Sequence, residues 1–170
     1  MSEICEKYCQ FLLIIGIVLV LAGVLITPQG SPRIRESTYE DIQEGTTEYT
    51  YEVPGQIHIL GISIVLLGAV TDGVGMGWLL WNTKENKISS NLRWINITSL
   101  ITGLMIASLG FYLAVTNDMQ TIYREAIPFI FNLAVEQIIG IAYLASGFII
   151  IIPAVYVLST FNSYNINHKE

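Results

Sequence analysis

Charged residues are scarce in this sequence, and most of them lie outside four long apolar runs. Only 13% of the 170 residues are charged and 52% are hydrophobic, and the mean hydropathy is +0.56. A soluble globular domain carries about 25% charged residues, so this composition excludes that class. The formal net charge of -6 also argues against nucleic acid and anionic lipid headgroups as partners.

Cysteine is absent from every loop between the apolar runs. The two cysteines, Cys5 and Cys9, both precede the first run, which excludes an outer domain stapled by disulfides. Their spacing places both thiols on one helical face. We interpret them as free thiols, with a ligand pair or a lipidation site as the alternatives. No His or Cys cluster completes a metal site, and no nucleophile–base pair is evident. The sequence therefore predicts no cofactor, no metal and no enzymatic activity.

Four apolar runs are long enough, or nearly so, to cross a bilayer, which takes roughly 20 residues of helix. We predict spans at residues 11–27, 57–81, 94–116 and 128–159, with a polar tail from 161, in a single integral membrane domain covering 1–170. The predicted fold class is an all-α membrane protein, a four-transmembrane-helix antiparallel bundle. A signal peptide is the alternative for the first run. We favour a retained helix, because no small-x-small cleavage site follows that run.

One pattern recurs in all four runs, namely two glycines seven residues apart. The members are Gly16 and Gly23, Gly61 and Gly68 with Gly75 in step, Gly103 and Gly110, and Gly140 and Gly147. Seven residues are close to two helical turns, so each set lies on one face of its helix. Small residues let membrane helices approach closely. We predict that these glycine faces pack the four helices together.

The first loop, 28–56, is acidic, and its second half has the pattern of a β-strand. It holds six of the 14 acidic residues: Glu36, Glu40, Asp41, Glu44, Glu48 and Glu52. Tyr49, Tyr51 and Val53 alternate with polar residues, as in a strand. We favour a small β-hairpin, with 33–39 as the partner strand, over a disordered acidic loop. An isolated hairpin is marginally stable, so it must lean on the helix ends or on another protein.

Polar residues inside the predicted spans are candidate functional sites, because burying them in lipid is costly. Asp72, His58 and Glu136 each lie three or four residues before a glycine of the repeat, and Asn96 lies seven before Gly103. All four are therefore predicted near the glycine faces, between helices. Asp72 is the strongest candidate, with plain packing between helices as the alternative to a functional role. It is either protonated, hydrated in a cavity or bonded to a partner protein.

Counting along the helices from the tryptophans at one predicted membrane interface gives the depth of these residues. The count brings Asp72 level with Ser99 and Thr102, which are candidate neutral partners. Aligning the second and fourth spans brings His58 level with Glu136. Such a pair could form a pH-sensitive contact if the two helices touch. A plain hydrogen bond between helices is the alternative.

Lysine and arginine are unevenly distributed between the two sides of the predicted bundle. The N-terminus, second loop and C-terminus hold Lys7, Lys84, Lys87, Arg93 and Lys169, whereas the first and third loops hold Arg33, Arg35 and Arg124. Cytoplasmic segments carry the excess of basic residues. We therefore predict a multi-pass protein of the cell membrane with both termini in the cytoplasm and the acidic loop outside.

Four spans with a β-prone first outer loop are similar in outline to the claudin-like architecture. That family's first loop carries a Trp-Gly-Leu-Trp-type signature and a cysteine pair, and residues 28–56 contain neither Trp nor Cys. Small multidrug transporters place their essential acid in the first span, where this chain has none. No family is assigned on these grounds.

Two functions remain open at this point. We expect a non-enzymatic structural or accessory membrane protein that assembles with other membrane proteins or with itself, through its glycine faces or its acidic loop. The alternative is a small transporter or channel subunit that uses Asp72, with His58 and Glu136, to move protons or cations.

Overall fold

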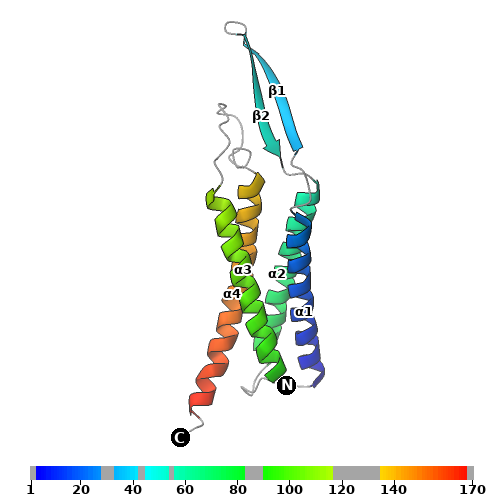
Figure 1. Cartoon of the computed structure of the whole chain (residues 1–170). Coiled ribbons are helices and arrows are strands. Elements are labelled where there is room, and N and C mark those ends of the chain that lie inside the picture. Colours follow the sequence, from blue (N-terminus) through cyan, green and yellow to red (C-terminus); the bar gives the residue numbers. More distant parts are fainter. Residues whose placement is uncertain are drawn as a thin grey trace.

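A computed structural model describes residues 3–27, 33–41, 45–53, 56–82, 90–116 and 135–167, as a bundle of four long helices with two paired strands at one end (Figure 1). The helices are α1 (Glu3–Ile26), α2 (Gln56–Asn82), α3 (Ser90–Thr116) and α4 (Val135–Asn167). Each contains a segment of 21 to 27 residues that is long and apolar enough to cross a membrane. The chain thus has the architecture of a multi-pass membrane protein.

The helices differ from the predicted spans at their ends. α1 begins at Glu3, so the polar lead is helical, and Gln10 Nε2 donates a hydrogen bond to Glu6 Oε1 at 3.3 Å. α3 begins at Ser90 rather than 94, and α4 continues through Pro153 into the predicted tail, as far as residue 167. Hydropathy detects only the segment that crosses the membrane. A helix can continue beyond that segment into water, because its ends depend on backbone hydrogen bonds and not on hydropathy. The predicted start of the fourth span at 128 lies outside the described residues.

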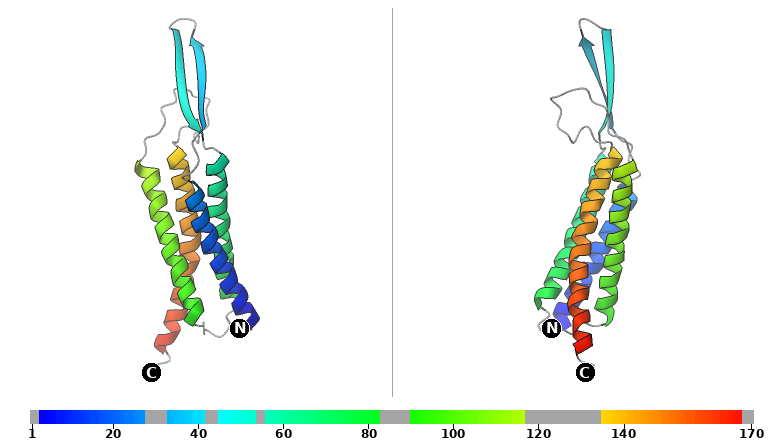
Figure 2. Two further views of the ribbon diagram at one scale, coloured as in Figure 1. Left: turned by 45° about the vertical axis from the view of Figure 1, so that its right-hand side comes forward. Right: turned by 90° about the vertical axis from the view of Figure 1, so that its left-hand side faces the viewer.

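The helices form two antiparallel pairs. α1 packs along α2 and α3 packs along α4, while the two pairs meet mainly between α2 and α4, with a smaller contact between α1 and α3 (Figure 2). Both ends of the chain lie at one end of the bundle, and the strands lie at the other (Figure 1).

Glycines set the distance between the helices of each pair. A Cβ placed on Gly68 would lie 2.7 Å from the Val20 nitrogen and 2.8 Å from the Gly16 carbonyl oxygen. A Cβ on Gly147 would lie 2.8 Å from the Gly103 carbonyl oxygen. Real Cβ atoms essentially never come within 3.0 Å of such atoms. No larger residue fits at these positions unless the helices move apart.

The same glycine pairing recurs in both helix pairs. Gly16 faces Gly68 and Gly23 faces Gly61 between α1 and α2, as Gly103 faces Gly147 and Gly110 faces Gly140 between α3 and α4. Residues of α3 therefore correspond to those of α1 at an offset of 87 (103 − 16), and residues of α4 to those of α2 at 79 (147 − 68). The close glycine contacts of the repeat join the helices within each pair.

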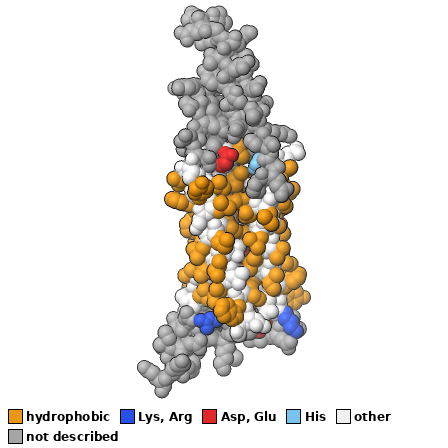
Figure 3. All heavy atoms as spheres, viewed as in Figure 1, with side chains coloured by type: hydrophobic (Ala, Val, Ile, Leu, Met, Phe, Trp, Pro, Cys, Tyr) orange, Lys and Arg blue, Asp and Glu red, His pale blue; other side chains and the backbone are white. Residues whose placement is uncertain are grey.

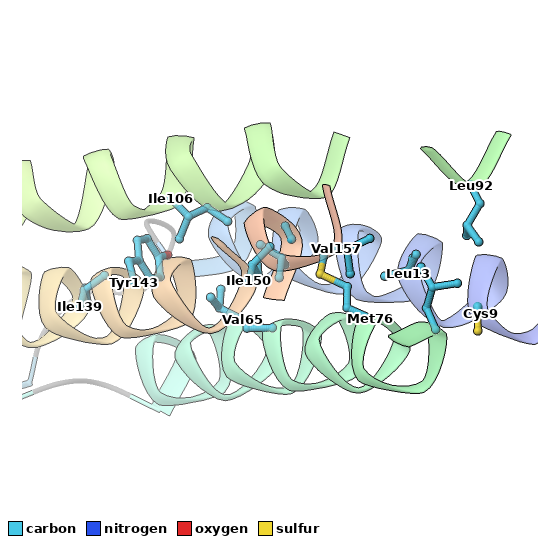
Figure 4. Close-up of a cluster of buried hydrophobic side chains, with 14 of the residues drawn as sticks. Cys9, Leu13, Val65, Met76, Leu92, Ile106, Ile139, Tyr143, Ile150 and Val157 are labelled. Carbon is cyan, nitrogen blue, oxygen red and sulfur yellow. The ribbon is translucent and has the colours of Figure 1, made fainter. Parts of the chain in front are cut away.

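Larger side chains fill the interior along the length of the bundle. Figure 4 shows this core running from Cys9 and Leu92 at one end to Ile139 and Tyr143 at the other, and all four are buried. The outer surface is apolar too. Figure 3 shows mainly apolar side chains over the face of the helices that it presents, with basic side chains visible at the end that holds the chain termini. An apolar exterior of this kind suits contact with lipid.

Two strands lie between α1 and α2 in the chain. β1 (Arg33–Asp41) pairs with β2 (Gly45–Val53) in antiparallel register, from Arg33 opposite Val53 to Asp41 opposite Gly45. These segments include those that the sequence assigns to a hairpin. The strands extend beyond the helix ends and do not lie across them (Figure 1).

Candidate functional site

Most hydrogen bonds of the serine and threonine hydroxyls stay within one helix. Thr71 is an example, with its Oγ1 2.8 Å from the Leu67 carbonyl oxygen one turn earlier. This local bond satisfies a hydroxyl without a partner on another helix. Ser99 on α3 differs, because its Oγ donates to Asp72 Oδ1 on α2 at 3.1 Å. The bond joins the two helix pairs, which makes Asp72 the starting point for a candidate site.

Asp72 is enclosed by three helices. Its side chain is fully buried at 0% exposure. A Cβ on Gly16 would lie 2.7 Å from the Asp72 Cβ, so the bare glycine on α1 makes room for the acid on α2. The second carboxyl oxygen, Oδ2, has no hydrogen-bond partner. A carboxylate in such a place is costly without a compensating positive charge.

Asn96 extends the polar contacts from α3 to α4. It is 1% exposed, and its Nδ2 donates to the Ala154 carbonyl oxygen at 3.3 Å. Its Oδ1 has no partner. Asn96 lies three residues before Ser99, so both side chains lie on the same face of α3. That face therefore contacts α2 through Ser99 and α4 through Asn96.

A separate polar group lies at the end of the bundle nearest the strands. His58 is buried and its Nδ1 has no hydrogen-bond partner. Gln137, the equivalent residue on α4 (58 + 79), is buried as well. Glu136 is exposed, and no ion pair joins it to His58. The predicted burial of Glu136 is therefore wrong, and the pair with His58 that the sequence left open does not form.

The physical reason lies in which side of the glycine face turns inward. Glu136 and Gln137 flank the face of Gly140 at nearly equal angles, four and three residues before it. On both α2 and α4, the residue three positions before the glycine is buried, namely His58 before Gly61 and Gln137 before Gly140. Glu136, four positions before Gly140, faces outward. Angular distance from the glycines could not separate the two.

The candidate polar residues do not form one site. His58 is 14 residues from Asp72, or about 21 Å along α2 at 1.5 Å per residue. No three side chains of His, Cys, Asp or Glu come together within the described part of the chain. Asp72 and Ser99 are joined by a hydrogen bond, and Asn96 lies one helical turn from Ser99 on the same face of α3.

Sequence reasoning found most of this group. It placed Asp72 and Asn96 between helices and gave Ser99 and Thr102 as partners for the acid, and the bond to Ser99 is confirmed. It missed the Ala154 carbonyl, because a backbone acceptor leaves no signal in a residue pattern. It placed both Gln137 and Glu136 near the face of Gly140 but kept only Glu136 as a candidate site, although Gln137 has the same offset from its glycine as His58.

Comparison of the chain with protein-family models, with curated proteins and with solved structures finds no match.

Proposed function

We propose that this chain is a non-enzymatic structural or accessory protein of the cell membrane, which assembles with other membrane proteins through its paired strands. The register of β1 and β2 is the observation that carries the proposal. Alternate residues of a strand fall on opposite faces. Alternation along strands paired in this register would give one face four acids: Glu36, Glu40, Glu48 and Glu52.

An acidic two-stranded ladder gains stability from a basic partner. Two strands alone are marginally stable in water, and acids at diagonal positions in this register, such as Glu36 and Glu48, carry like charge with no basic residue opposite either of them. A partner with a basic surface outside the membrane would offset both effects and would be selected by charge. The strands extend beyond the helices (Figure 1), which supports contact with the outer part of a neighbouring membrane protein.

The helix bundle acts as the anchor in this proposal. Close glycine contacts within each helix pair hold the helices at short distance, where van der Waals attraction drives membrane helix association. A tightly joined bundle gives the strands a fixed base. The basic residues counted in the sequence favour cytoplasmic termini, and the strands would then face outward.

Co-purification tests the proposal. The tagged chain is extracted from its own membrane in gentle detergent, and a stoichiometric partner is expected to elute with it. Replacing the four face glutamates by glutamine should release the partner, as should high salt, because screening weakens charge pairing. The matched control carries Ser37→Ala and Thr47→Ala on the opposite face and should retain the partner. Recovery of a clean monomer or homo-oligomer from the parent chain would contradict the proposal.

Orientation is tested with a membrane-impermeant thiol reagent on intact cells. A single cysteine introduced at Thr47, in a variant lacking Cys5 and Cys9, should react from outside. A cysteine introduced at Lys84 should react only after the membrane is permeabilised. The reverse pattern would place the strands inside the cell.

Proton or cation movement through Asp72 is the second candidate function. It is supported by the full burial of this acid between the two helix pairs and by the unpartnered Oδ2. In this case Asp72→Asn should abolish ion- or pH-dependent flux in reconstituted liposomes while the fold is retained. Unchanged flux, or no flux with the parent chain, would discard this candidate.

A further inference from the structure

We infer that Asp72, Ser99 and Asn96 form a binding site for one monovalent cation of the size of sodium, at the contact between the two helix pairs. The inference goes beyond the proposed function, because a bound ion requires neither a protein partner nor transport.

Two buried acceptors without partners are the first support. Asp72 Oδ2 and Asn96 Oδ1 belong to side chains that are 0% and 1% exposed, and neither atom has a hydrogen-bond partner. An ionised carboxylate and an amide oxygen only accept hydrogen bonds, so they cannot satisfy each other. Buried polar groups in folded proteins are nearly always satisfied. A cation bound by both oxygens would satisfy them together.

The neighbouring bonds hold these oxygens in place. Ser99 Oγ donates to Asp72 Oδ1 and so fixes one side of the carboxyl group. Asn96 Nδ2 is bound to the Ala154 carbonyl oxygen, which leaves Oδ1 as the free end of the amide. Along α3, Asn96 and Ser99 are about 4.5 Å apart at 1.5 Å per residue.

Pro153 leaves one carbonyl oxygen of α4 without its helical donor. Proline has no N–H, and the carbonyl four residues earlier, which would have accepted from it, is that of Ile149. The Ile149 oxygen lies 3.6 Å from the position of a Cβ on Gly73, and Gly73 follows Asp72 directly in α2. Carbonyls released from a helix are known ligands of sodium where repeated helical units meet in a membrane protein.

The charge of the site favours a monovalent ion. Asp72 supplies one negative charge, and the other oxygens are neutral. Calcium takes six to eight oxygens, commonly from several carboxylates, and no group of three acidic or other metal-binding side chains occurs in the described helices. The basic side chains of Lys7 and Arg93 are exposed. Lys7 lies nine residues before Gly16, or about 13 Å along α1. Arg93 lies six residues before Ser99, or about 9 Å along α3.

Thermal unfolding of the full chain in detergent tests this site. Tryptophan fluorescence is followed at pH 8 and constant ionic strength while sodium chloride replaces choline chloride. The unfolding midpoint is expected to rise and saturate with sodium, with about one radioactive sodium ion bound per chain at equilibrium. Asp72→Asn should abolish both effects, whereas the control Glu136→Gln removes an exposed carboxyl group and should change neither.

A second variant keeps the test decisive if Asp72→Asn fails to fold. Ser99→Ala retains the carboxylate but loses its positioning bond, and it should weaken sodium binding about tenfold, a typical effect of losing one supporting contact at a metal ion. Three results would overturn the inference: equal stabilisation by choline, sodium dependence that survives in Asp72→Asn, or stabilisation by low pH with no sodium dependence. The third would assign Asp72 to a proton.

Discussion

Substitution of Gly68 by alanine is the most direct test of how the helices are held together. The added Cβ would meet Val20 N at 2.7 Å and Gly16 O at 2.8 Å, and both are backbone atoms that cannot turn aside. Ordinary contact begins at 3.4 Å, so α1 and α2 must separate by about 0.7 Å (3.4 − 2.7). A gap of 0.5–1 Å forfeits a quarter to a half of the van der Waals attraction between the atoms it separates.

These terms give an expected loss of stability. Overpacking costs about 1–3 kcal/mol, and alanine returns up to ~1 kcal/mol of helix propensity. The free energy of unfolding should therefore fall by about 1–2 kcal/mol, a factor of roughly 5–30 in the folded-to-unfolded ratio. Titration with a denaturing detergent in mixed micelles, followed by circular dichroism, measures this change.

Gly77 provides the matched control on the same helix. A Cβ at Gly77 would have nothing within 4 Å, so Gly77→Ala should leave stability unchanged or raise it by up to ~1 kcal/mol. Gly147→Ala, at the position equivalent to Gly68 in the second helix pair, should lose about as much as Gly68→Ala. If Gly68→Ala proves as stable as Gly77→Ala, glycine contact does not hold the helix pairs together.

Two further predictions concern single side chains. Ser99→Ala should lower the free energy of unfolding by about 1–3 kcal/mol, because it leaves a buried carboxyl group with no hydrogen bond. The control Ser63→Ala, at an exposed hydroxyl, should change it by less than about 0.5 kcal/mol. Equal effects of the two substitutions in the same detergent titration would contradict the role given to Ser99. In a Cys5→Ser variant, the buried Cys9 should react with a thiol reagent only after unfolding, as followed by mass spectrometry, and rapid reaction in the native state would show that this end of α1 is open.

Most of the helical architecture could be predicted from the sequence, because a membrane imposes strong rules on composition. The apolar segments of α1 to α4 are visible as runs of hydrophobic residues. The burial of Asp72 and Asn96 follows from the cost of exposing them to lipid. The helix ends could not be predicted as well, since continuation of α1 and α4 beyond the apolar segment depends on backbone hydrogen bonds and not on hydropathy.

The arrangement between helices could not be predicted in this way. All four glycine faces look alike in the sequence, yet close contact pairs α1 with α2 and α3 with α4. Glu136 and Gln137 lie at similar angles to Gly140, and only the position of the neighbouring helices decides which one is buried. The same holds for the bond between Asn96 and the Ala154 carbonyl oxygen, which joins residues 58 positions apart.

The sequence by itself determined that four helices long enough to cross a membrane would form and which polar residues they would have to shelter, because solvation by lipid acts on each segment separately. Only the tertiary structure decided which helix faces which, and that Asn96, one turn from Ser99 on α3, binds the Ala154 carbonyl oxygen of α4. Those outcomes depend on shape and distance between segments far apart in the chain, and a periodic pattern along one helix contains neither.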